Sequence, residues 1–158
     1  MLGPALRELV AGAMGTVALD ITTYMDMAIR GRSASDAPSQ LVHIIAEQIR
    51  LPLSSQGVGS QDQTARNRES GLGVLLGYVN GLGTGCIYGM LRSQFGEIPI
   101  PLAGTLVGLT AMAASDVPLV ALRVSDPKTW GISGWLADLI PHLIYGIVTV
   151  ATYEALSK

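Results

Sequence analysis

Apolar residues gather into four stretches of the chain, each long enough to cross a bilayer. A helix needs about 20 mostly apolar residues to span a hydrocarbon core about 30 Å thick. A window of about 19 residues finds such stretches at 9–29, 72–91, 100–122 and 135–156. The first is the most polar, because Asp20 near its middle costs about 3 kcal/mol on insertion scales. The pattern predicts an all-α fold, a polytopic membrane helix bundle of four transmembrane helices in one integral membrane domain over residues 1–158.

The composition indicates lipid as the main solvent. Hydrophobic residues make up 49% of the chain and charged residues 14%, against about 25% charged in soluble proteins, and the mean hydropathy is +0.42. Asp20 and Asp26 interrupt the first apolar stretch, so we expect a retained helix there and no cleaved signal. The formal net charge of −2 indicates no nucleic-acid partner. The expected partner is the lipid bilayer.

The distribution of Lys and Arg predicts an orientation. Most of these residues lie on one side of the four spans, namely Arg30, Arg32, Arg50, Arg66, Arg68, Arg123 and Lys128. Because cytoplasmic loops carry the excess of basic residues, the loop 31–70 and the loop before the last span are predicted to be cytoplasmic. Both termini are then expected outside, which agrees with an even number of spans.

The polar loop 31–70 is predicted to contain a short amphipathic cytoplasmic helix at 38–51. Its apolar face carries Leu41, Val42, Ile45 and Ile49. We interpret it as a helix lying on the cytoplasmic leaflet, with docking against a soluble partner as the alternative. Residues 54–70, rich in Ser, Gln, Gly and Asn, are predicted to be a flexible linker.

Glycine occurs at every fourth position of the second span, at Gly73, Gly77, Gly81, Gly85 and Gly89. Small residues at this spacing let two helix backbones approach closely in lipid. The third span offers a matching pair, Gly104 and Gly108. We therefore predict tight helix packing through this glycine ladder. Its partner lies either within the chain or in a second copy, so a homo-oligomer or another membrane-protein partner stays open.

Polar residues recur inside the predicted spans. Positions three and four apart share a helix face, which aligns Asp138, His142, Tyr145, Thr149 and Tyr153 in the last span. The first span carries Thr16, Asp20, Thr23 and Tyr24 in the same way, and the second carries Asn80, Thr84 and Tyr88. Such polar faces are predicted to point into the bundle.

Six of these polar groups are predicted to descend from the cytoplasmic ends of the spans. At 1.5 Å per residue, Asp26 and Asp138 lie about 5 Å deep, Asp116 and His142 about 10 Å, and Asp20 and Asn80 about 14 Å. If they converge, they form an acidic funnel in which some carboxyl groups hold protons and His142 is the counter-charge. The alternative is structural. Asp138 could cap a helix that begins at Pro141, Asp116 could bond the carbonyl freed by Pro118, and Asp26 could pair with Arg30.

Other chemistries have little support in the sequence. Asp116, Asp138 and His142 could hold Mn, Fe or Zn, but no tight ligand spacing indicates a metal site, so the metal question stays open. No cofactor is predicted, because a bis-His haem would need a second imidazole at membrane depth and His43 lies in the polar loop. No nucleophile–base motif indicates an enzyme.

The chain contains the stretches SDVPLVALRVSDPKTW (115–130), DLIPHLIYG (138–146) and DITTYMDMAIRGR (20–32). These resemble stretches of small, uncharacterised four-helix bacterial membrane proteins, and the resemblance covers most of the chain. More distantly, HLIYG (142–146) is similar to an element near the end of YagU-like inner-membrane proteins, which are loosely associated with acid tolerance. Both resemblances imply a bacterial cytoplasmic (inner) membrane protein, and neither implies an activity or a site residue.

Two hypotheses about function follow. In the first, the protein conducts or exchanges protons or a cation through the funnel. The groups of this path are Asp20, Asp116, Asp138 and His142, with Asn80, Asp26 and Tyr145 beside them. In the second, the protein is a non-catalytic accessory or scaffolding subunit that packs through its glycine ladder. The first hypothesis predicts a hydrated path past Tyr145 and Thr149, and the second predicts a closed interior.

Overall fold

The computed structural model describes residues 3–53, 61–92, 94 and 98–158, and every regular element in this part of the chain is helical. The elements are α1 (Pro4–Arg30), α2 (Ala37–Gln48), α3 (Gln61–Arg92), α4 (Ile100–Ala121), the 3-10 helix η1 (Pro127–Thr129) and α5 (Gly131–Ser157). Proline in the first turn starts α1, α2 and α4, where its missing N–H costs no hydrogen bond. The predicted all-α fold is confirmed.

Three of the described helices are long and apolar enough to cross a membrane. They are α4, α5 and the Gln63–Arg92 part of α3, which correspond to the predicted third, fourth and second spans. The predicted first span corresponds to α1, whose 27 residues are about 40 Å long. It has the length to cross, but with Asp20 and Asp26 inside it α1 is too polar to count as a span by composition. The chain therefore has the character of a membrane protein with three clear candidate spans.

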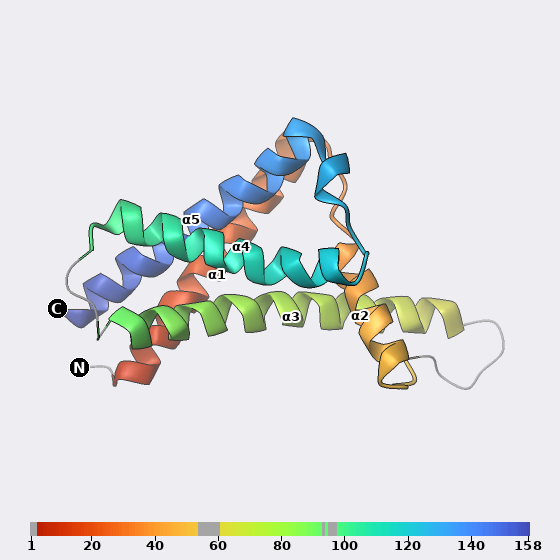
Figure 1. The fold of residues 1–158 in the computed structure, drawn as a ribbon, viewed down its shortest axis with the longest axis horizontal. Coiled ribbons are helices and arrows are strands. Elements are labelled where there is room, and N and C mark those ends of the chain that lie inside the picture. The colour runs from red at the N-terminus through yellow and green to blue at the C-terminus, as the bar shows by residue number, and fades with distance from the viewer. Residues whose placement is uncertain (1–2, 54–60, 93, 95–97) are drawn as a thin grey trace.

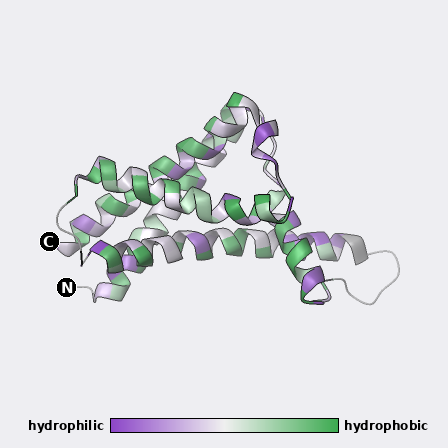
Figure 2. Ribbon diagram, viewed as in Figure 1, coloured by the Kyte–Doolittle hydropathy of each residue, from purple (hydrophilic) through white to green (hydrophobic). Residues whose placement is uncertain are grey.

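The four long helices pack in a ring. Helix α1 lies against α3 and α5, α5 lies against α4, and α4 closes the ring on α3. Figure 1 shows α1 and α5 running antiparallel, and both the first turn of α1 and the last turn of α5 at the same end of the bundle. Toward the opposite end, the α1–α5 pair diverges from α3 and α4 (Figure 1). Hydrophilic residues gather at that end, in the first turns of α3 and after α4 (Figure 2).

The glycine ladder of α3 has partners within the chain. A Cβ on Gly85 would lie 2.6 Å from the Gly12 Cα of α1, and a Cβ on Gly89 would lie 2.9 Å from Tyr153 of α5. Gly81 faces Thr16 and Tyr145, and Gly73 faces Pro38 of α2 at 3.0 Å. Helices can approach one another this closely only at glycine, because a Cβ at these positions would overlap atoms of the facing helix.

Three positions depart from the predicted glycine pairing. Gly104 and Gly108 pack against Ile147 and His142 of α5, so α4 does not present them to the ladder of α3. At Gly77 an added Cβ would meet no atom within 4 Å, so this rung of the ladder is open.

The polar loop 31–70 is more helical than predicted. Helix α2 agrees with the predicted amphipathic helix, and its Val42 and Ala46 are buried where it packs on α3. Ile49, predicted for the same apolar face, is 66% exposed. The linker prediction is wrong for residues 61–70, because α3 begins at Gln61, while residues 54–60 lie outside the described part. The polar residues at 61–70 form the first turns of α3, a helix end that extends beyond the apolar span.

Candidate functional site

The polar stripe of α5 lies inside the bundle, as predicted. His142 is 8% exposed, Tyr145 1% and Thr149 0%. Helix α5 packs between α1 and α4, and residues three and four apart share the face that it buries. Helix α5 also continues through Pro141. Asp138 is therefore not the cap of a helix that begins there, and this structural explanation for its place in the span is wrong.

A carboxyl–imidazole cluster forms where α4 meets α5. The Nδ1 atom of His142 lies 3.1 Å from Asp138 Oδ1 and 2.9 Å from the Asp138 backbone carbonyl oxygen. The Asp116 carboxyl group of α4 lies beside that of Asp138, within hydrogen-bonding range, and also within electrostatic range of His142. Asp138 Oδ2 is buried, and none of the described residues donates an N–H or O–H to it. We call Asp116, Asp138 and His142 the Asp–His cluster.

The geometry of this cluster suits it to hold a proton. Two unit charges 4 Å apart repel by about 4 kcal/mol at an effective dielectric constant of about 20. A proton on one of the two carboxyl groups would remove that repulsion, and the protonated group could donate its O–H to the other carboxylate. His142 Nδ1 lies within reach of two Asp138 oxygens, both of them acceptors, so the imidazole donates its N–H in this contact. The Asp–His cluster can therefore hold a proton between its two carboxyl groups, beside an imidazole that donates to one of them.

Two other polar groups of the predicted funnel are satisfied by neighbours. Asp26 accepts hydrogen bonds from Arg30 and Arg32, and Arg30 also donates to Ser133 of α5 at 2.6 Å. Asn80 donates to the Ala111 carbonyl at 3.0 Å and to Ser115 Oγ at 2.7 Å, which ties α3 to α4. These contacts give Asp26 and Asn80 structural roles.

The first span contributes less to the interior than predicted. Asp20 accepts a hydrogen bond of 3.4 Å from Tyr78, whose side chain is itself exposed. Tyr24 is 61% exposed, so the prediction that it faces the bundle is wrong. Of the six groups of the predicted funnel, only Asp116, Asp138 and His142 therefore come together, and Asp20 contacts Tyr78 instead.

Beyond the cluster the centre of the bundle is closed. Tyr145 donates a hydrogen bond of 2.6 Å from its hydroxyl to the Gly81 carbonyl of α3. Its ring fills the space that Gly15 of α1 leaves, where an added Cβ would lie 2.9 Å from the ring. The hydrated path that conduction predicts past Tyr145 and Thr149 is absent from this conformation, at residues that are 1% and 0% exposed.

The end of the bundle near the chain termini carries an ion pair that the sequence analysis did not predict. Arg92 of α3 donates to Glu154 of α5 at 2.6 Å, and Tyr88 donates to the same carboxylate at 3.2 Å. Tyr88 also packs edge-on against Tyr153, with ring centroids 5.4 Å apart. One signal was present in the sequence. Arg92 and Glu154 fall at the same predicted membrane level, at the ends of the second and fourth spans, with opposite charge.

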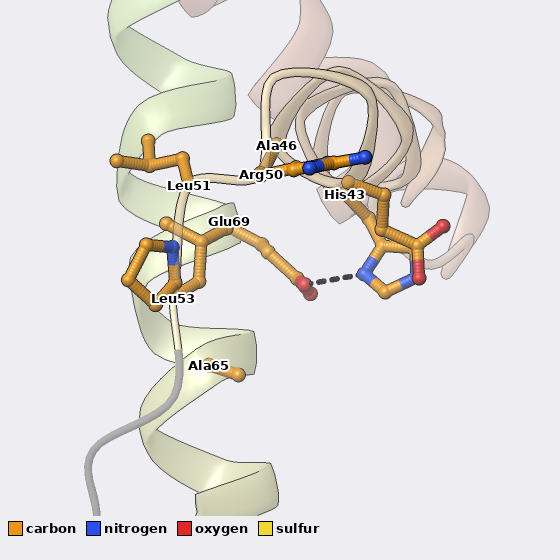
Figure 3. Close-up of a pocket in the computed structure, with 9 residues that line it drawn as sticks. His43, Ala46, Arg50, Leu51, Leu53, Ala65 and Glu69 are labelled. Carbon is orange, nitrogen blue, oxygen red and sulfur yellow. Dashed lines mark hydrogen bonds and ion pairs between the residues drawn. The ribbon is translucent and has the colours of Figure 1, made fainter.

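A second site lies outside the spans, where α2 meets the polar end of α3. A cavity of about 390 Å³ is lined by His43, Glu47, Arg50, Leu51, Leu53 and Glu69, among others. Figure 3 shows the His43 ring and the Glu69 carboxylate pointing toward one another, 2.8 Å apart, while Glu47 lies 3.4 Å from the other ring nitrogen. The Glu69 carboxylate accepts a hydrogen bond from the ring, and this contact raises the pKa of His43.

No group of three or more His, Cys, Asp or Glu side chains with metal-binding geometry occurs among the residues that the structure describes. The Asp–His cluster is therefore not arranged as a preformed metal site. In comparisons with known proteins, no family model, curated protein or solved structure matches the chain.

Proposed function

We propose that the protein exchanges protons across the bacterial cytoplasmic membrane through the Asp–His cluster, and that it is a transport protein and not an enzyme. The observation that carries the proposal is the buried Asp138 Oδ2, to which none of the described residues donates, in a carboxyl group that interacts with that of Asp116. Intramembrane ionisable groups are costly, and those without a structural partner are the first candidates for function. A single proton satisfies this oxygen, so we favour protons over a metal cation.

The proposal includes a fourth transmembrane helix. Helix α1 packs along both α3 and α5, which are candidate spans, so a bilayer around those helices also surrounds α1. Its Asp26 is paired with two arginines, which offsets part of the cost of placing a carboxylate there. With four spans, the excess of Lys and Arg in the loops places both termini outside and opens the diverging end of the bundle to the cytoplasm.

The test is proton flux driven by a pH gradient in proteoliposomes. The native protein is compared with empty liposomes and with Asp116→Asn and His142→Ala, after folding and insertion of each variant have been checked. Asp36→Asn and His43→Ala are matched controls, since both residues are exposed and lie outside the spans. We expect flux from the native protein and both controls, and at least a tenfold loss in the two cluster variants. Native flux equal to that of empty liposomes would refute the proposal.

The second candidate function is an accessory or scaffolding subunit. It is favoured by the closed centre at Tyr145 and by the unfilled position beside Gly77, which offers a second helix a place to approach α3. The neighbouring Val74, Leu75 and Val79 are more than half exposed, as lipid-facing or partner-facing residues would be. A protein without flux that copurifies with a second membrane protein, and loses it on Gly77→Leu, would support this function.

A further inference from the structure

A cavity of about 300 Å³ lies between the second half of α3 and the first half of α4. Both helices are candidate membrane spans, and Figure 1 shows these two halves at the end of the bundle that holds the chain termini. We call the cavity the α3–α4 groove. Its lining includes Thr84, Ile87, Leu91, Ala103, Leu106 and Val107. Its volume lies at the lower end of the range of about 300–1,000 Å³ that is usual for ligand sites.

The α3–α4 groove exists because these two helices present their glycines elsewhere. Gly104 and Gly108 of α4 pack on α5, and Gly85 of α3 packs on α1. Asn80 joins α3 to α4 by hydrogen bonds, but it lies nearer the Asp–His cluster. Beyond Asn80, none of the described glycines of either helix packs against the other helix. The two backbones therefore do not approach closely at this level, and a space remains between them.

The polar side chains that line the groove are already hydrogen-bonded within the protein. Thr110 donates to a carbonyl of its own helix at 2.8 Å, and Thr84 donates to another side chain of α3 at 3.4 Å. Tyr88 and Arg92 both donate to Glu154 of α5. A bound water molecule needs several polar partners, so water is poorly suited to this space. The groove instead suits an occupant that needs no hydrogen bond, such as a hydrocarbon chain.

The mouth of the groove faces the bilayer. Ile87, Leu91 and Leu106 at its rim are 54%, 46% and 55% exposed, whereas Ala103 and Val107 in its lining are 3% and 8% exposed. Because both helices are candidate spans, the exposed rim residues lie among acyl chains. A lipid chain can therefore enter the groove sideways and reach its buried lining without leaving an apolar medium.

One end of the groove is polar. Arg92 is the last residue of the candidate span in α3, and Tyr88 lies one turn before it. Arg side chains at the end of a span place the guanidinium at the level of the lipid head groups. Thr84, in the buried lining, lies eight residues deeper, about 12 Å along the helix axis. A phospholipid has the same order of polarity, with a hydrocarbon chain below its ester and head groups.

We propose that the α3–α4 groove binds one acyl chain of a membrane phospholipid, with the ester and head groups at the level of Arg92. The bound chain fills the space between α3 and α4 and covers apolar side chains of both helices. The inference rests on the location of these two helices in the bilayer, and it is independent of the proposed proton exchange.

The test uses a phosphatidylcholine that carries a photoactivatable diazirine in the middle of one acyl chain. The full chain is reconstituted into dioleoyl-phosphatidylcholine vesicles that contain a small fraction of this probe. After irradiation, mass spectrometry of the protein identifies the labelled residues. We expect the label to concentrate on Ile87, Leu91 and Leu106.

Two pairs of variants test whether the groove holds the labelled chain. Leu106→Trp narrows the groove, and Leu102→Trp is its matched control, because both leucines are 55% exposed on α4 and Leu102 lies outside the described lining. Ile87→Trp and Val79→Trp form a second pair on α3, which decides the test if Leu106→Trp does not fold. We expect labelling of Leu91 to fall at least fivefold in both groove variants and to keep its native level in both controls.

Three outcomes would overturn the lipid site. Native labelling of Leu91 in the folded groove variants would show that the chain does not occupy the groove. Equal labelling of all exposed apolar residues at one depth would show that lipid only covers the surface. Stronger labelling of the groove by a free fatty acid with the same diazirine, at equal concentration, would replace the phospholipid with another amphiphile. None of these measurements depends on proton flux, so they leave the proposed function to its own test.

Discussion

Asp26 and Asp138 lie near the same end of two helices that pack together, α1 and α5, yet their surroundings differ. Asp26 accepts hydrogen bonds from Arg30 and Arg32, two permanent cations. Asp138 faces one imidazole, which can be neutral or charged, and a second carboxyl group. An arginine pair fixes the charge of a carboxylate, whereas an imidazole and an acid allow it to change. The partners of an intramembrane acid, more than its depth, indicate whether it serves structure or proton exchange.

The largest expected effect is a difference in proton flux between variants of Asp138 and variants of Asp26. We expect Asp138→Asn to lower pH-gradient-driven flux at least tenfold per folded molecule, because the amide cannot take up a proton, while its oxygen can still accept the hydrogen bond from His142. Asp26→Asn should keep native flux per folded molecule. Flux in proteoliposomes, normalised to folded protein, measures both. Equal losses in the two variants would remove the distinction between them.

The next effect concerns the helix approach that brings Asp116 to Asp138. A Cβ on Gly108 would overlap the His142 carbonyl and lie 3.1 Å from the Leu143 Cα, so Gly108→Ala must push α4 away from α5. We expect the free energy of unfolding of Gly108→Ala to fall by about 1–3 kcal/mol. We also expect its proton flux to fall, because Asp116 would lie farther from Asp138. Reversible unfolding in mixed detergent, followed by tryptophan fluorescence, measures the first quantity.

Gly77→Ala is the control for Gly108→Ala, since no atom lies within 4 Å of the added Cβ. It should leave flux unchanged and stabilise α3 by up to about 1 kcal/mol through helix propensity. If Gly108→Ala were as stable and as active as Gly77→Ala, the close packing of α4 on α5 would not be needed for the cluster.

A smaller effect is expected on the stability of the protein when Asp26 is changed. Asp26→Asn leaves Arg30 and Arg32 without their shared carboxylate, so it should lower the midpoint of thermal unfolding and the yield of inserted protein. Asp36→Asn, an exposed change of the same kind before α2, should leave both unchanged. A midpoint for Asp26→Asn equal to the native value would contradict a structural role for the Asp26–arginine contacts.

The smallest expected effect involves the His43–Glu69 pair, in which an exposed imidazole contacts a carboxylate. The contact with Glu69 raises the pKa of His43 above its ordinary value of 6.5. The protonated ring therefore stabilises the docking of α2 on α3 fully below about pH 6.5, and this stabilisation is lost as pH rises through the raised value. Hydrogen exchange of the α2 amides, corrected for intrinsic rate, should show weaker protection above that range. His43→Gln should remove the pH dependence, and a pH dependence that survives in His43→Gln would exclude this pair as its cause.

Much of the fold could be predicted from the sequence, because hydropathy and helical periodicity are local. The spans at 72–91, 100–122 and 135–156 each correspond to a helix that is apolar enough to cross a membrane. The buried stripe from His142 to Thr149 follows from the spacing of its residues on α5. The polar first turns of α3 were assigned to a linker, because composition alone does not distinguish a solvated helix from a loop.

The contacts between helices could not be predicted, because periodicity gives the face of a helix but not its neighbour. The pairing of Gly108 with α5, the exposure of Tyr24 and the Arg92–Glu154 pair all depend on how the helices rotate and cross. Depth counting placed Asp116 and His142 at one level, and the structure brings both to Asp138. The same counting placed Asp20 and Asn80 together, but Asp20 bonds Tyr78 and Asn80 bonds α4.

The central claim is that Asp116 and Asp138 take up and release protons as a pair. The most direct test is infrared difference spectroscopy of the reconstituted protein across a series of pH steps, which detects the carbonyl band of a protonated carboxyl group. The account predicts a pH-dependent band that is lost in both Asp116→Asn and Asp138→Asn and retained in Asp26→Asn and Asp36→Asn. A band that survives in both cluster variants would contradict it, and so would a native protein in which no carboxyl band changes with pH.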